Sequence, residues 1–374
     1  MSAAEAAAMR RALALAAGGP PHGPNPRVGC VLLGPHGDVL AEGRHEGAGT
    51  PHAEVAALAA ARAAGRPTAG ATAVVTLEPC RHTGRTGPCT RALVEAGVAR
   101  VVAAVEDPGP RAGGGAEELR AAGVDVVVGH AREEAEALTR YWRHAVATGR
   151  PFVTLKWAST LDGRVAAPDG TSRWLTGAPA RADVHRRRAG ADAVVVGTGT
   201  ALVDDPWLTT RDPGTDRPLP RQPLRTVVGR RPLPPGARLL DDAAETLLLP
   251  THDVEAVLTA LAEREVRHAW VEGGPTLAAA FLRAGAVDEV VAYLAPALLG
   301  GGPAVVADLG AVSVRDTVRL DLVSVETVGG DVALVARPRR GPARTSSTTS
   351  TTSTTSTTGT TAAAPASAPA GRTS

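Results

Sequence analysis

The chain has 374 residues, a length that predicts two domains, and its net charge of +2 does not indicate a nucleic-acid partner. Hydrophobic residues make up 44% of the chain but aromatic residues only 2%, so alanine and valine must fill most of its interior. No apolar run approaches the length that a membrane-spanning helix needs.

The first half of the chain alternates between helix-forming and strand-forming stretches. We expect helices over residues 3–17, 53–64, 89–96 and 133–148, and strands over residues 28–33, 39–42, 72–77, 98–105 and 124–128. This alternation is typical of a mixed sheet flanked by helices. Gly149-Arg150-Pro151 would then end the last helix and the domain.

Metal-binding residue types gather between residues 50 and 91. Pro51-His52-Ala53-Glu54 is followed by Leu77-Glu78-Pro79-Cys80 and then by Pro88-Cys89. This order matches the described H-x-E…P-C signature of zinc-dependent base deaminases. Three protein ligands leave the fourth zinc position open for water, whose pKa the metal lowers. We therefore predict His52, Cys80 and Cys89 as zinc ligands and Glu54 as the residue that moves the proton from water to the leaving ammonia.

The spacing of His52 and Glu54 predicts where the helix begins. On a regular helix, two residues that are two positions apart point to nearly opposite faces. The Gly- and Pro-containing residues 47–51 break regular structure, so we expect His52 at the helix entry and Glu54 in the first turn. Cys89 is also expected at a helix N-terminus, where its thiolate is favoured.

The second half of the chain predicts another α/β domain. We expect strands over residues 152–158, 193–196, 226–228, 246–249, 268–272 and 287–294, and a basic helix over residues 178–188. Strand 268–272 runs into Gly273-Gly274-Pro275-Thr276-Leu277, which opens a helix, and such a junction suits a phosphate group. No G-x-G-x-x-G motif is present, so a Rossmann fold is not indicated. Residues 341–374 are rich in Ser, Thr, Ala and Pro, which predicts a disordered tail.

The two predicted cysteine ligands are further apart than the C-x-x-C pair of a generic deaminase. Residues 81–88 lie between them and contain Arg81 and Arg85, which suits a phosphorylated substrate. With this insertion, three stretches resemble the bifunctional deaminase–reductase family of bacterial riboflavin biosynthesis. They are Gly23-Pro24-Asn25-Pro26-Arg27-Val28-Gly29-Cys30, Pro51-His52-Ala53-Glu54-Val55, and Thr76-Leu77-Glu78-Pro79-Cys80 with Gly84-Arg85-Thr86-Gly87-Pro88-Cys89.

The resemblance covers residues 1 to about 338 and implies a two-domain α/β fold. A cytidine-deaminase-like zinc domain would occupy residues 1–148, a dihydrofolate-reductase-like domain residues 149–340, and the disordered tail residues 341–374. In the family, the first domain hydrolytically deaminates 2,5-diamino-6-ribosylamino-4(3H)-pyrimidinone 5′-phosphate. The second uses NADPH to reduce the ribosyl group to a ribityl chain. The resemblance therefore implies Zn²⁺ and NADPH as cofactors.

The resemblance also implies which residues form the two sites. Asn25, the only asparagine, matches the pyrimidine-contacting element, and Lys156, the only lysine, belongs with Leu161-Asp162-Gly163 to a family signature. The implied NADPH contacts are Ala158, Trp174, Thr200, Asp204, Gly274, Pro275, Thr276, Leu277, Ala278, Ala279 and Ala280. The implied substrate contacts are Asn25, Ser172, Arg188, Leu208, Arg211 and Glu272, of which the two arginines suit the 5′-phosphate.

The chain departs from the family pattern at three places. Arg81 stands where the family usually has Ser, and Gly109 replaces the Asn that is common in the loop after the strand at 98–105. In the second domain, Gly229-Arg230 stands where an acidic residue and Ser are common. We hypothesise that Arg230 contacts the 2′-phosphate of NADPH.

Three other functions fit part of the sequence. One is a reductase with an inactive zinc domain, another is a nucleotide or tRNA deaminase, and the third is a zinc-binding interaction module without activity. A tRNA deaminase would leave the second domain unexplained. We expect phosphorylated pyrimidines as substrates, without nucleic-acid or membrane partners, and a homo-oligomer is compatible with the sequence. The odd count of three cysteines and the lack of a basic signal-peptide region favour the cytoplasm.

Overall fold

The computed structural model describes residues 2–83, 87–212 and 214–339. The expected tail at 341–374 lies outside the described residues, as does Gly84-Arg85-Thr86 in the insertion between the two cysteines. The described residues belong to one compact unit that ends at Arg339.

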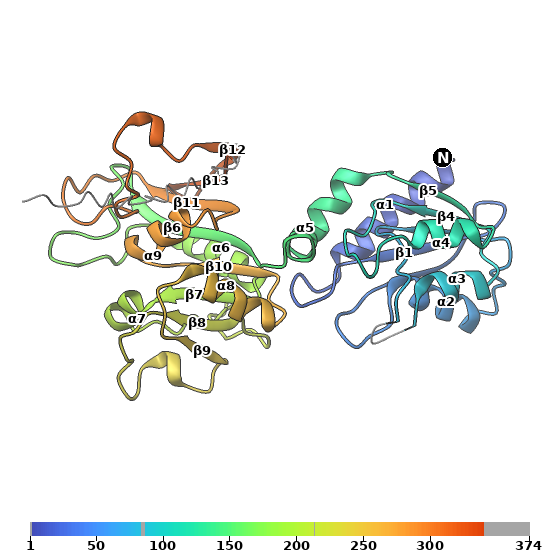
Figure 1. Ribbon diagram of the computed structural model, residues 1–374, viewed down its shortest axis with the longest axis horizontal. Helices are drawn as coiled ribbons and strands as arrows, with labels where there is room; N and C mark the ends of the chain where they lie inside the picture. The colour runs from blue at the N-terminus through green and yellow to red at the C-terminus, as the bar shows by residue number, and fades with distance from the viewer. Residues whose placement is uncertain (1, 84–86, 213, 340–374) are drawn as a thin grey trace, which may run out of the picture. The chain divides into compact units, whose positions relative to one another are not determined.

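The N-terminal domain is built on a five-stranded mixed sheet with the order β2-β1-β3-β4-β5 (Figure 1). Its strands are β1 (Gly29–Leu33), β2 (Val39–Arg44), β3 (Thr72–Val75), β4 (Arg100–Ala103) and β5 (Asp125–Val128). Strand β1 pairs antiparallel with both β2 and β3, whereas β3, β4 and β5 are parallel. Parallel neighbours need a crossover, and helices follow β3 and β4 for this reason.

The helices of the first half are α1 (Ala3–Ala17), α2 (Ala53–Ala63), α3 (Cys89–Glu95), α4 (Gly115–Ala121) and α5 (Arg132–Thr148). A capping box formed by Ser2 and Glu5 starts α1. Helices α1 and α2 both pack on the antiparallel strands β1 and β2. Helix α5 contacts α1 but also β6 and β10 of the second sheet, so it joins the two halves, and the boundary at residues 148 and 149 stays a prediction.

The C-terminal domain contains an eight-stranded sheet with the order β12-β13-β11-β6-β10-β7-β8-β9. Its strands are β6 (Phe152–Thr160), β7 (Ala193–Gly197), β8 (Leu224–Val228), β9 (Thr246–Leu249), β10 (His268–Val271), β11 (Glu289–Ala295), β12 (Leu320–Val328) and β13 (Asp331–Pro338). The six strands from β11 to β9 are parallel, and β13 and β12 add an antiparallel edge. The carboxyl ends of parallel strands are where ligands bind in open α/β sheets.

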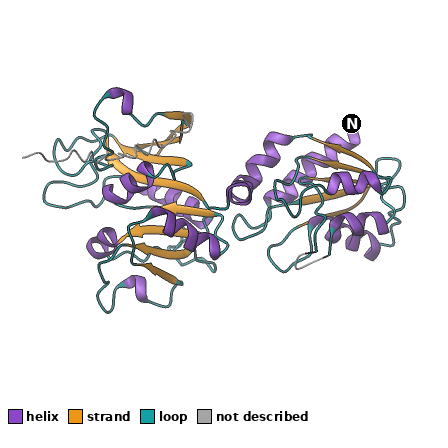
Figure 2. Cartoon of the chain, in the orientation of Figure 1, coloured by secondary structure: helices purple, strands orange, loops and turns teal. Residues whose placement is uncertain are grey.

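The helices of this domain lie between its parallel strands in the sequence and on the sheet surfaces in space (Figure 2). They are α6 (Ala178–Ala189), α7 (Thr198–Asp204), α8 (Val254–Glu263) and α9 (Pro275–Arg283), with 3₁₀ turns at Arg238–Leu240 and Val314–Asp316. In α8, Asp253 caps the N-terminus and Val254, Val257, Leu258 and Leu261 are buried. That spacing places four apolar side chains on one face of the helix.

The composition of the cores agrees with the scarcity of aromatic residues. In the N-terminal domain, the buried core cluster consists mostly of alanine, valine and leucine side chains. Trp270, Tyr293 and Phe281 are among the largest fully buried side chains of the whole chain, and all three belong to the C-terminal domain. Small side chains therefore fill the first core, as the sequence predicts.

The predicted elements of the first half are confirmed to within a few residues at each end, and α1 has the predicted bounds. In the second half, α8, β12 and β13 are elements that the sequence pattern did not predict. The prediction of no helix over residues 198–204 is wrong, because they form α7.

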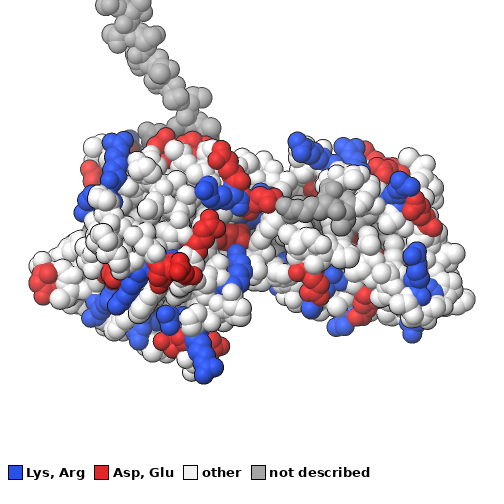
Figure 3. Space-filling view, turned by 90° about the horizontal axis from the view of Figure 1, so that it is seen from below, with Lys and Arg blue, Asp and Glu red and all other residues white. Residues whose placement is uncertain are grey.

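Two features of the described residues concern the membrane and nucleic-acid partners that the sequence analysis does not expect: the apolar character of the helices and the distribution of surface charge. Among the described helices, none combines the length and the apolar character needed to cross a bilayer. On the face seen in Figure 3, the basic and acidic side chains of the described residues are interspersed.

Candidate functional site

Three potential metal donors converge in the N-terminal domain. The donor atoms of His52, Cys80 and Cys89 all lie within 4.8 Å of one another. The Nδ1 atom of His52 lies 3.2 Å from Sγ of Cys89 and 3.5 Å from Sγ of Cys80. Donors of a tetrahedral zinc ion with ordinary Zn–N and Zn–S bond lengths would be about 3.5 Å apart. The three side chains therefore fit zinc and leave one tetrahedral position for a further ligand.

The helix positions of the donors agree with the sequence analysis. His52 is the N-cap of α2 and has extended backbone angles, so its side chain does not follow the helical spacing that would point it away from Glu54. Cys89 is the first residue of α3 and is fully buried. Hydrogen bonding with Cys89 lowers the pKa of the Cys80 thiol, which favours the thiolate that binds a metal.

Glu54 lies in the first turn of α2, beside the three donors, and is only 4% exposed. Burial raises the pKa of the Glu54 carboxyl to about 7. A group with a pKa near neutrality can both accept and release a proton at physiological pH. The site thus contains three metal donors and, beside them, one buried carboxyl that is suited to proton transfer.

Asn25 is held close to this centre by His45, a residue that the sequence analysis missed. His45 is 4% exposed, and its Nδ1 atom lies 3.0 Å from the Pro51 carbonyl oxygen. A carbonyl can only accept, so His45 Nδ1 donates and Nε2 is left as an acceptor. The Asn25 amide donates to Nε2 over 2.9 Å, and the His45 ring meets the His52 ring edge-on with centroids 5.5 Å apart.

The loop that carries Cys80 packs tightly against residues 107–116. Both carboxylate oxygens of Glu78 accept backbone hydrogen bonds, from Asp107 at 2.9 Å and from Ala116 at 2.8 Å. Asp107 faces the same region, and burial raises the pKa of its carboxyl to about 6. A Cβ atom at Gly115 would lie 1.8 Å from the Pro79 carbonyl oxygen, so only glycine fits there.

Two departures from the family pattern lie in the same region. The guanidinium of Arg81 lies beside Gly114, whose added Cβ would meet Nη1 at 3.1 Å. Gly109 donates its backbone N–H to Asp107 over 2.7 Å. Arg81 and Gly109 therefore both border the loop that faces the metal donors, and neither displaces a donor.

The C-terminal domain contains a cleft of about 1660 Å³ at the carboxyl ends of its parallel strands. Most of the cofactor and substrate residues implied for this domain line it. They are Ala158, Ser172, Trp174, Arg188, Thr200, Asp204, Leu208, Arg211, Glu272, Gly274, Pro275, Thr276, Leu277 and Ala280. Lys156, from the family signature, lines the cleft as well. Ala278 and Ala279 do not line the cleft; each is 1% exposed on the buried side of α9.

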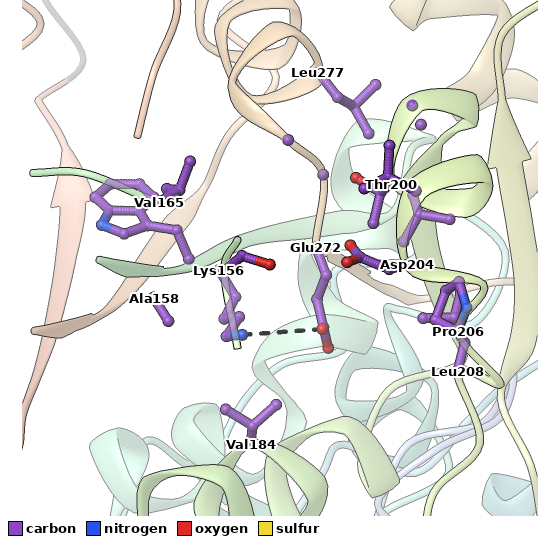
Figure 4. A pocket seen from close by; sticks show the side chains of 18 of the residues that line it. Lys156, Ala158, Val165, Val184, Thr200, Asp204, Pro206, Leu208, Glu272 and Leu277 are labelled. Carbon is purple, nitrogen blue, oxygen red and sulfur yellow. Dashed lines mark ion pairs between the residues drawn. The ribbon is translucent and has the colours of Figure 1, made fainter. Parts of the chain in front are cut away.

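A charged pair from two neighbouring strands lies in the cleft. Figure 4 shows Lys156 of β6 and Glu272, which follows β10, pointing toward one another, and Lys156 Nζ lies 4.0 Å from Glu272 Oε2. Their side chains are only 16% and 12% exposed. Burial lowers the pKa of Lys156. Although burial opposes ionisation of Glu272, Arg188 and Lys156 hold the pKa of its carboxyl at about 2.

The two arginines that were expected to bind phosphate are held differently. Arg188 pairs with both carboxylate oxygens of Glu272, at 2.9 and 2.8 Å, and also donates to the Thr209 carbonyl. Arg211 lies over the Trp207 ring, 5.2 Å from its centroid, and its closest carboxylate is that of the exposed Asp216 at 3.7 Å. Arg211 is therefore less tightly paired with a carboxylate than Arg188 is.

The Gly-Gly turn between β10 and α9 forms one wall of the cleft. Gly274 is the N-cap of α9 and Pro275 its first residue, so the first backbone N–H groups of this nine-residue helix have no intrahelical acceptors. Thr200 lies opposite this turn, because a Cβ at Gly274 would meet its Oγ1 at 3.6 Å. The glycine pair that the sequence places between a strand and a helix thus lines the cleft.

Leu161-Asp162-Gly163 lies next to the cleft, because the Gly163 carbonyl oxygen accepts from the backbone N–H of Val305, which lines it. Asp162 accepts backbone hydrogen bonds from Leu299 at 3.2 Å and from Gly300 at 2.7 Å. Together with the hydroxyl of Thr160, these donors lower the pKa of Asp162 to about 2. Asp162 therefore stays ionised and fixes the turn at Leu299 and Gly300 and does not serve as a proton donor.

The departure at Gly229-Arg230 also lies at the cleft. Gly229 has a φ of +132°, and an added Cβ would lie 2.5 Å from Oγ1 of Thr198, so a larger side chain would strain this position. The side chain of Arg230 is exposed and lines the cleft.

Tyr293 also lines the cleft and was not predicted from the sequence, and neither was its partner Asp183. The Tyr293 hydroxyl donates to Asp183 Oδ2 over 2.6 Å, and the Tyr293 ring lies 6.0 Å from Lys156 Nζ. Neither residue belongs to a motif, and their contact joins β11 to α6, which are far apart in the sequence.

Both halves of the chain match known families. Residues 2–105 match the cytidine and deoxycytidylate deaminase zinc-binding region, and residues 151–334 match the RibD C-terminal domain. The chain is 51% identical over 318 residues to the riboflavin biosynthesis protein RibD of Mycobacterium tuberculosis, covering 84% of this chain and 92% of that protein. It is 43% identical over 344 residues to RibD of Escherichia coli, covering 83% and 93% respectively.

Solved structures give the same result. The crystal structure of a diaminohydroxyphosphoribosylaminopyrimidine deaminase/5-amino-6-(5-phosphoribosylamino)uracil reductase from Thermotoga maritima has a TM-score of 0.80 at 35% identity and covers 90% of this chain and 99% of that chain. Acinetobacter baumannii RibD has a TM-score of 0.81 at 37% identity with the same coverage. The expected order of a deaminase domain followed by a reductase domain is confirmed. Because the similarity spans both domains and most of each relative, the chain belongs to the RibD family of riboflavin biosynthesis, whose members join a deaminase to a reductase.

Proposed function

We propose that this chain catalyses two consecutive steps on a phosphorylated pyrimidine. The first is hydrolytic deamination of 2,5-diamino-6-ribosylamino-4(3H)-pyrimidinone 5′-phosphate, and the second is NADPH-dependent reduction of its ribosyl group to ribityl. The strongest support is that one chain contains both a three-donor metal centre beside a buried glutamate and a cleft with a buried lysine–glutamate pair.

In the first step, an amino group on the pyrimidine ring is exchanged for oxygen and leaves as ammonia. His52, Cys80 and Cys89 would hold zinc, which when bound supplies a Lewis acid that lowers the pKa of a water molecule. Glu54 takes a proton from that water and returns it to the departing amino group, so the carboxyl ends as it began. The burial that raises the pKa of Glu54 to about 7 suits both transfers.

Asn25 orients the pyrimidine in this proposal. The His45 ring fixes the Asn25 amide through the 2.9 Å hydrogen bond, and one amide hydrogen and the amide oxygen stay available to the substrate. The planar head of asparagine can therefore donate to and accept from the edge of a base. Arg81, beside the same loop, supplies a cation for the negative end of the substrate.

In the second step, the ribosylamine opens to an imine, which gains a hydride at C1′ and a proton at its nitrogen. The Gly-Gly turn and α7, which line the cleft, would hold NADPH, and the cofactor when bound would supply the hydride for C1′. Lys156 donates the proton that the imine nitrogen requires, because its ammonium is largely buried in the cleft and has a lowered pKa. Glu272 stays ionised and keeps Lys156 charged before transfer.

Arg211 is the better candidate for the 5′-phosphate in the reductase cleft. Arg188 is already paired through two hydrogen bonds with Glu272, whereas Arg211 donates to the Asp216 carbonyl oxygen at 2.9 Å and has the exposed Asp216 carboxylate 3.7 Å away. In this proposal, Arg188 orders Glu272 and Arg211 contacts the phosphate. Ser172, Trp174 and Leu208 complete the walls that receive the ribosyl chain and the nicotinamide.

We assign this activity to the cytoplasm. Zinc binding at this centre needs two free thiols, and all three cysteines of the chain are free and buried. A reducing compartment keeps such thiols available for a metal.

Zinc removal tests the separation of the two steps. Treatment with a chelator is expected to abolish ammonia release, while NADPH oxidation with the already deaminated pyrimidine continues. Added Zn²⁺ should restore the first reaction. Equal loss of both reactions in the chelated protein would contradict two independent sites.

A further inference from the structure

The loop at residues 20–27 carries Asn25 toward the metal centre but belongs to no helix or strand. The hydrogen bond to His45 links Asn25 to the centre, because the His45 ring meets the ring of His52. Gly23-Pro24 comes directly before Asn25 in the sequence. The position of Asn25 therefore depends on what holds this pair.

Two residues of the C-terminal domain hold the loop. The Gly23 backbone N–H donates to Asp192 Oδ1 over 2.6 Å. The Arg267 Nε atom donates to the Pro24 carbonyl oxygen over 3.3 Å. Both contacts end on the two residues before Asn25, so the C-terminal domain ties down the loop next to its functional side chain.

Asp192 is itself held firmly in the sheet of the C-terminal domain. It comes directly before β7 and is 8% exposed. Its Oδ2 atom accepts from the backbone N–H groups of Arg267 at 2.9 Å and His268 at 3.0 Å, and Arg221 lies 3.3 Å from Oδ1. A carboxylate with both oxygens used in this way has little freedom to move. Asp192 can therefore transmit the position of β7 and β10 to the loop.

We propose that Asp192 is a positioning residue for deamination, acting from the reductase domain through the loop that carries Asn25. This inference rests on the proposed deaminase function. Residues 18–24 include three glycines and three prolines, and without a tether such a segment samples several conformations. The tether thus gives the deaminase site an ordered Asn25 only when the adjoining part of the reductase domain is folded.

The main test compares Asp192→Asn and Arg267→Ala with the wild-type chain. Each change removes or weakens one of the two contacts with the loop, and Arg267→Ala keeps the backbone N–H that binds Asp192. We expect kcat/KM for ammonia release to fall by roughly 10-fold to 100-fold, because small misplacements of a substrate-orienting group have effects of this size. The loss should fall mainly on KM. Zinc content and NADPH oxidation with the deaminated substrate should change by less than about 2-fold, since neither Asp192 nor Arg267 lines the metal site or the cleft.

Hydrogen–deuterium exchange gives a readout that does not depend on activity. Peptides that cover residues 19–27 should exchange faster in both variants. Asp192→Asn weakens the acceptor of the Gly23 N–H, and Arg267→Ala removes the donor to the Pro24 carbonyl oxygen. Asp288→Asn is the matched control. Asp288 is another buried carboxylate of this domain, but it pairs with Arg150 and the backbone of Val153, away from the loop.

The outcomes separate this inference from the function on which it rests. Unchanged ammonia release and unchanged exchange of residues 19–27 in both variants would overturn it. A parallel loss of both reactions, shared by Asp288→Asn, would show only a structural role and would also overturn it. Absence of ammonia release from the zinc-loaded wild-type chain would count against the proposed function itself.

Discussion

Glu54 illustrates how residue-scale features set the chemistry of the metal centre. Its side chain lies in the first turn of α2, is 4% exposed and lies beside the three donors without being one of them. Burial therefore acts on a carboxyl that is available for proton transfer, and raises its pKa to about 7. The role of Glu54 can be separated experimentally from metal binding.

Glu54→Gln is expected to keep zinc and to lose ammonia release by at least about 100-fold, because an amide of the same shape cannot take and return the proton. Metal analysis and an ammonia assay on the same preparation measure the two properties. Glu46→Gln, at an exposed carboxylate nearby, is the control and should leave both unchanged. Substantial ammonia release by the Glu54 variant would remove its assigned role.

Lys156 gives the reductase step a pH dependence with a defined sign. The proposed acid is the ammonium form, so the reaction is supported below the pKa of Lys156 and is lost as pH rises through it. Burial lowers this pKa from 10.5, so the loss should begin at a lower pH than for an exposed lysine.

The Lys156→Arg variant tests this assignment. Arginine keeps the positive charge but does not release its proton in proteins, so kcat for NADPH oxidation should fall by about 100-fold while ammonia release is retained. The pH–rate profile of the wild-type chain with deaminated substrate supplies the second measurement. A variant with the wild-type rate and alkaline limb would show that another group donates the proton.

Arg230 is expected to determine the choice between NADPH and NADH. It is exposed and lines the cleft after β8, and a cation there can pair with the 2′-phosphate that NADH lacks. Arg230→Ala should lower the ratio of kcat/KM for NADPH to that for NADH by about 10-fold, a loss typical of a charge-assisted hydrogen bond. Arg264→Ala, at an exposed arginine outside the cleft, is the matched control. An unchanged cofactor preference would leave Arg230 without this role.

At the scale of elements, the N-termini of the helices bring the metal donors together. His52 can turn toward the cysteines because it caps α2, and Cys89 approaches from the first residue of α3. Helix α4 must then pack closely on the loop of Cys80, and its first residue, Gly115, touches the Pro79 carbonyl. Three helix N-termini thus meet around one metal-binding loop.

Gly115→Ala is expected to disturb this junction selectively. A Cβ 1.8 Å from the Pro79 oxygen forces the loop or α4 to move, which should cost the N-terminal domain about 1–3 kcal/mol and lower its zinc content. Thermal unfolding and metal analysis are the measurements, and NADPH oxidation with deaminated substrate should persist. Gly87→Ala, where a new Cβ meets nothing within 4 Å, is the control. Equal effects of the two substitutions would refute the close-packing explanation.

How far the elements could be predicted depended on how local their signals are. The zinc donors lie in short motifs next to a helix start, so the sequence indicates both the ligands and the turn that brings them together. His45 gives no such signal, because only the packing of the end of β2 against the start of α2 brings its ring to His52. The contact of Tyr293 with Asp183 is likewise purely tertiary.

The missed elements have physical explanations of their own. Helix α7 begins in Gly197-Thr198-Gly199-Thr200, whose composition favours a turn, and it is stabilised by burial of Thr198 and Ala201. Strand β12 is mostly exposed at the edge of the sheet, so its sequence lacks a buried apolar run. Helix α8, in contrast, carries a readable signal, since Asp253 caps it and apolar residues recur at helical spacing.

At the scale of the whole molecule, two different sheets support two different chemistries in one chain. The antiparallel and parallel strands of the first sheet present helix entries that bind a metal, whereas the parallel strands of the second end at a cleft. Asp192 and Arg267 connect the second domain to the loop that orients Asn25. The product of the first site is the substrate of the second in the proposed order, so one preparation should perform both steps.

The most direct test supplies freshly made diaminopyrimidinone ribosylamine phosphate to the purified zinc-loaded protein, with and without NADPH. Ammonia release and NADPH oxidation are followed separately. We expect ammonia release without NADPH, and oxidation of one NADPH for each ammonia released once NADPH is added. Oxidation that occurs only when the already deaminated pyrimidine is supplied would contradict it, because the metal centre would then have no deaminase activity.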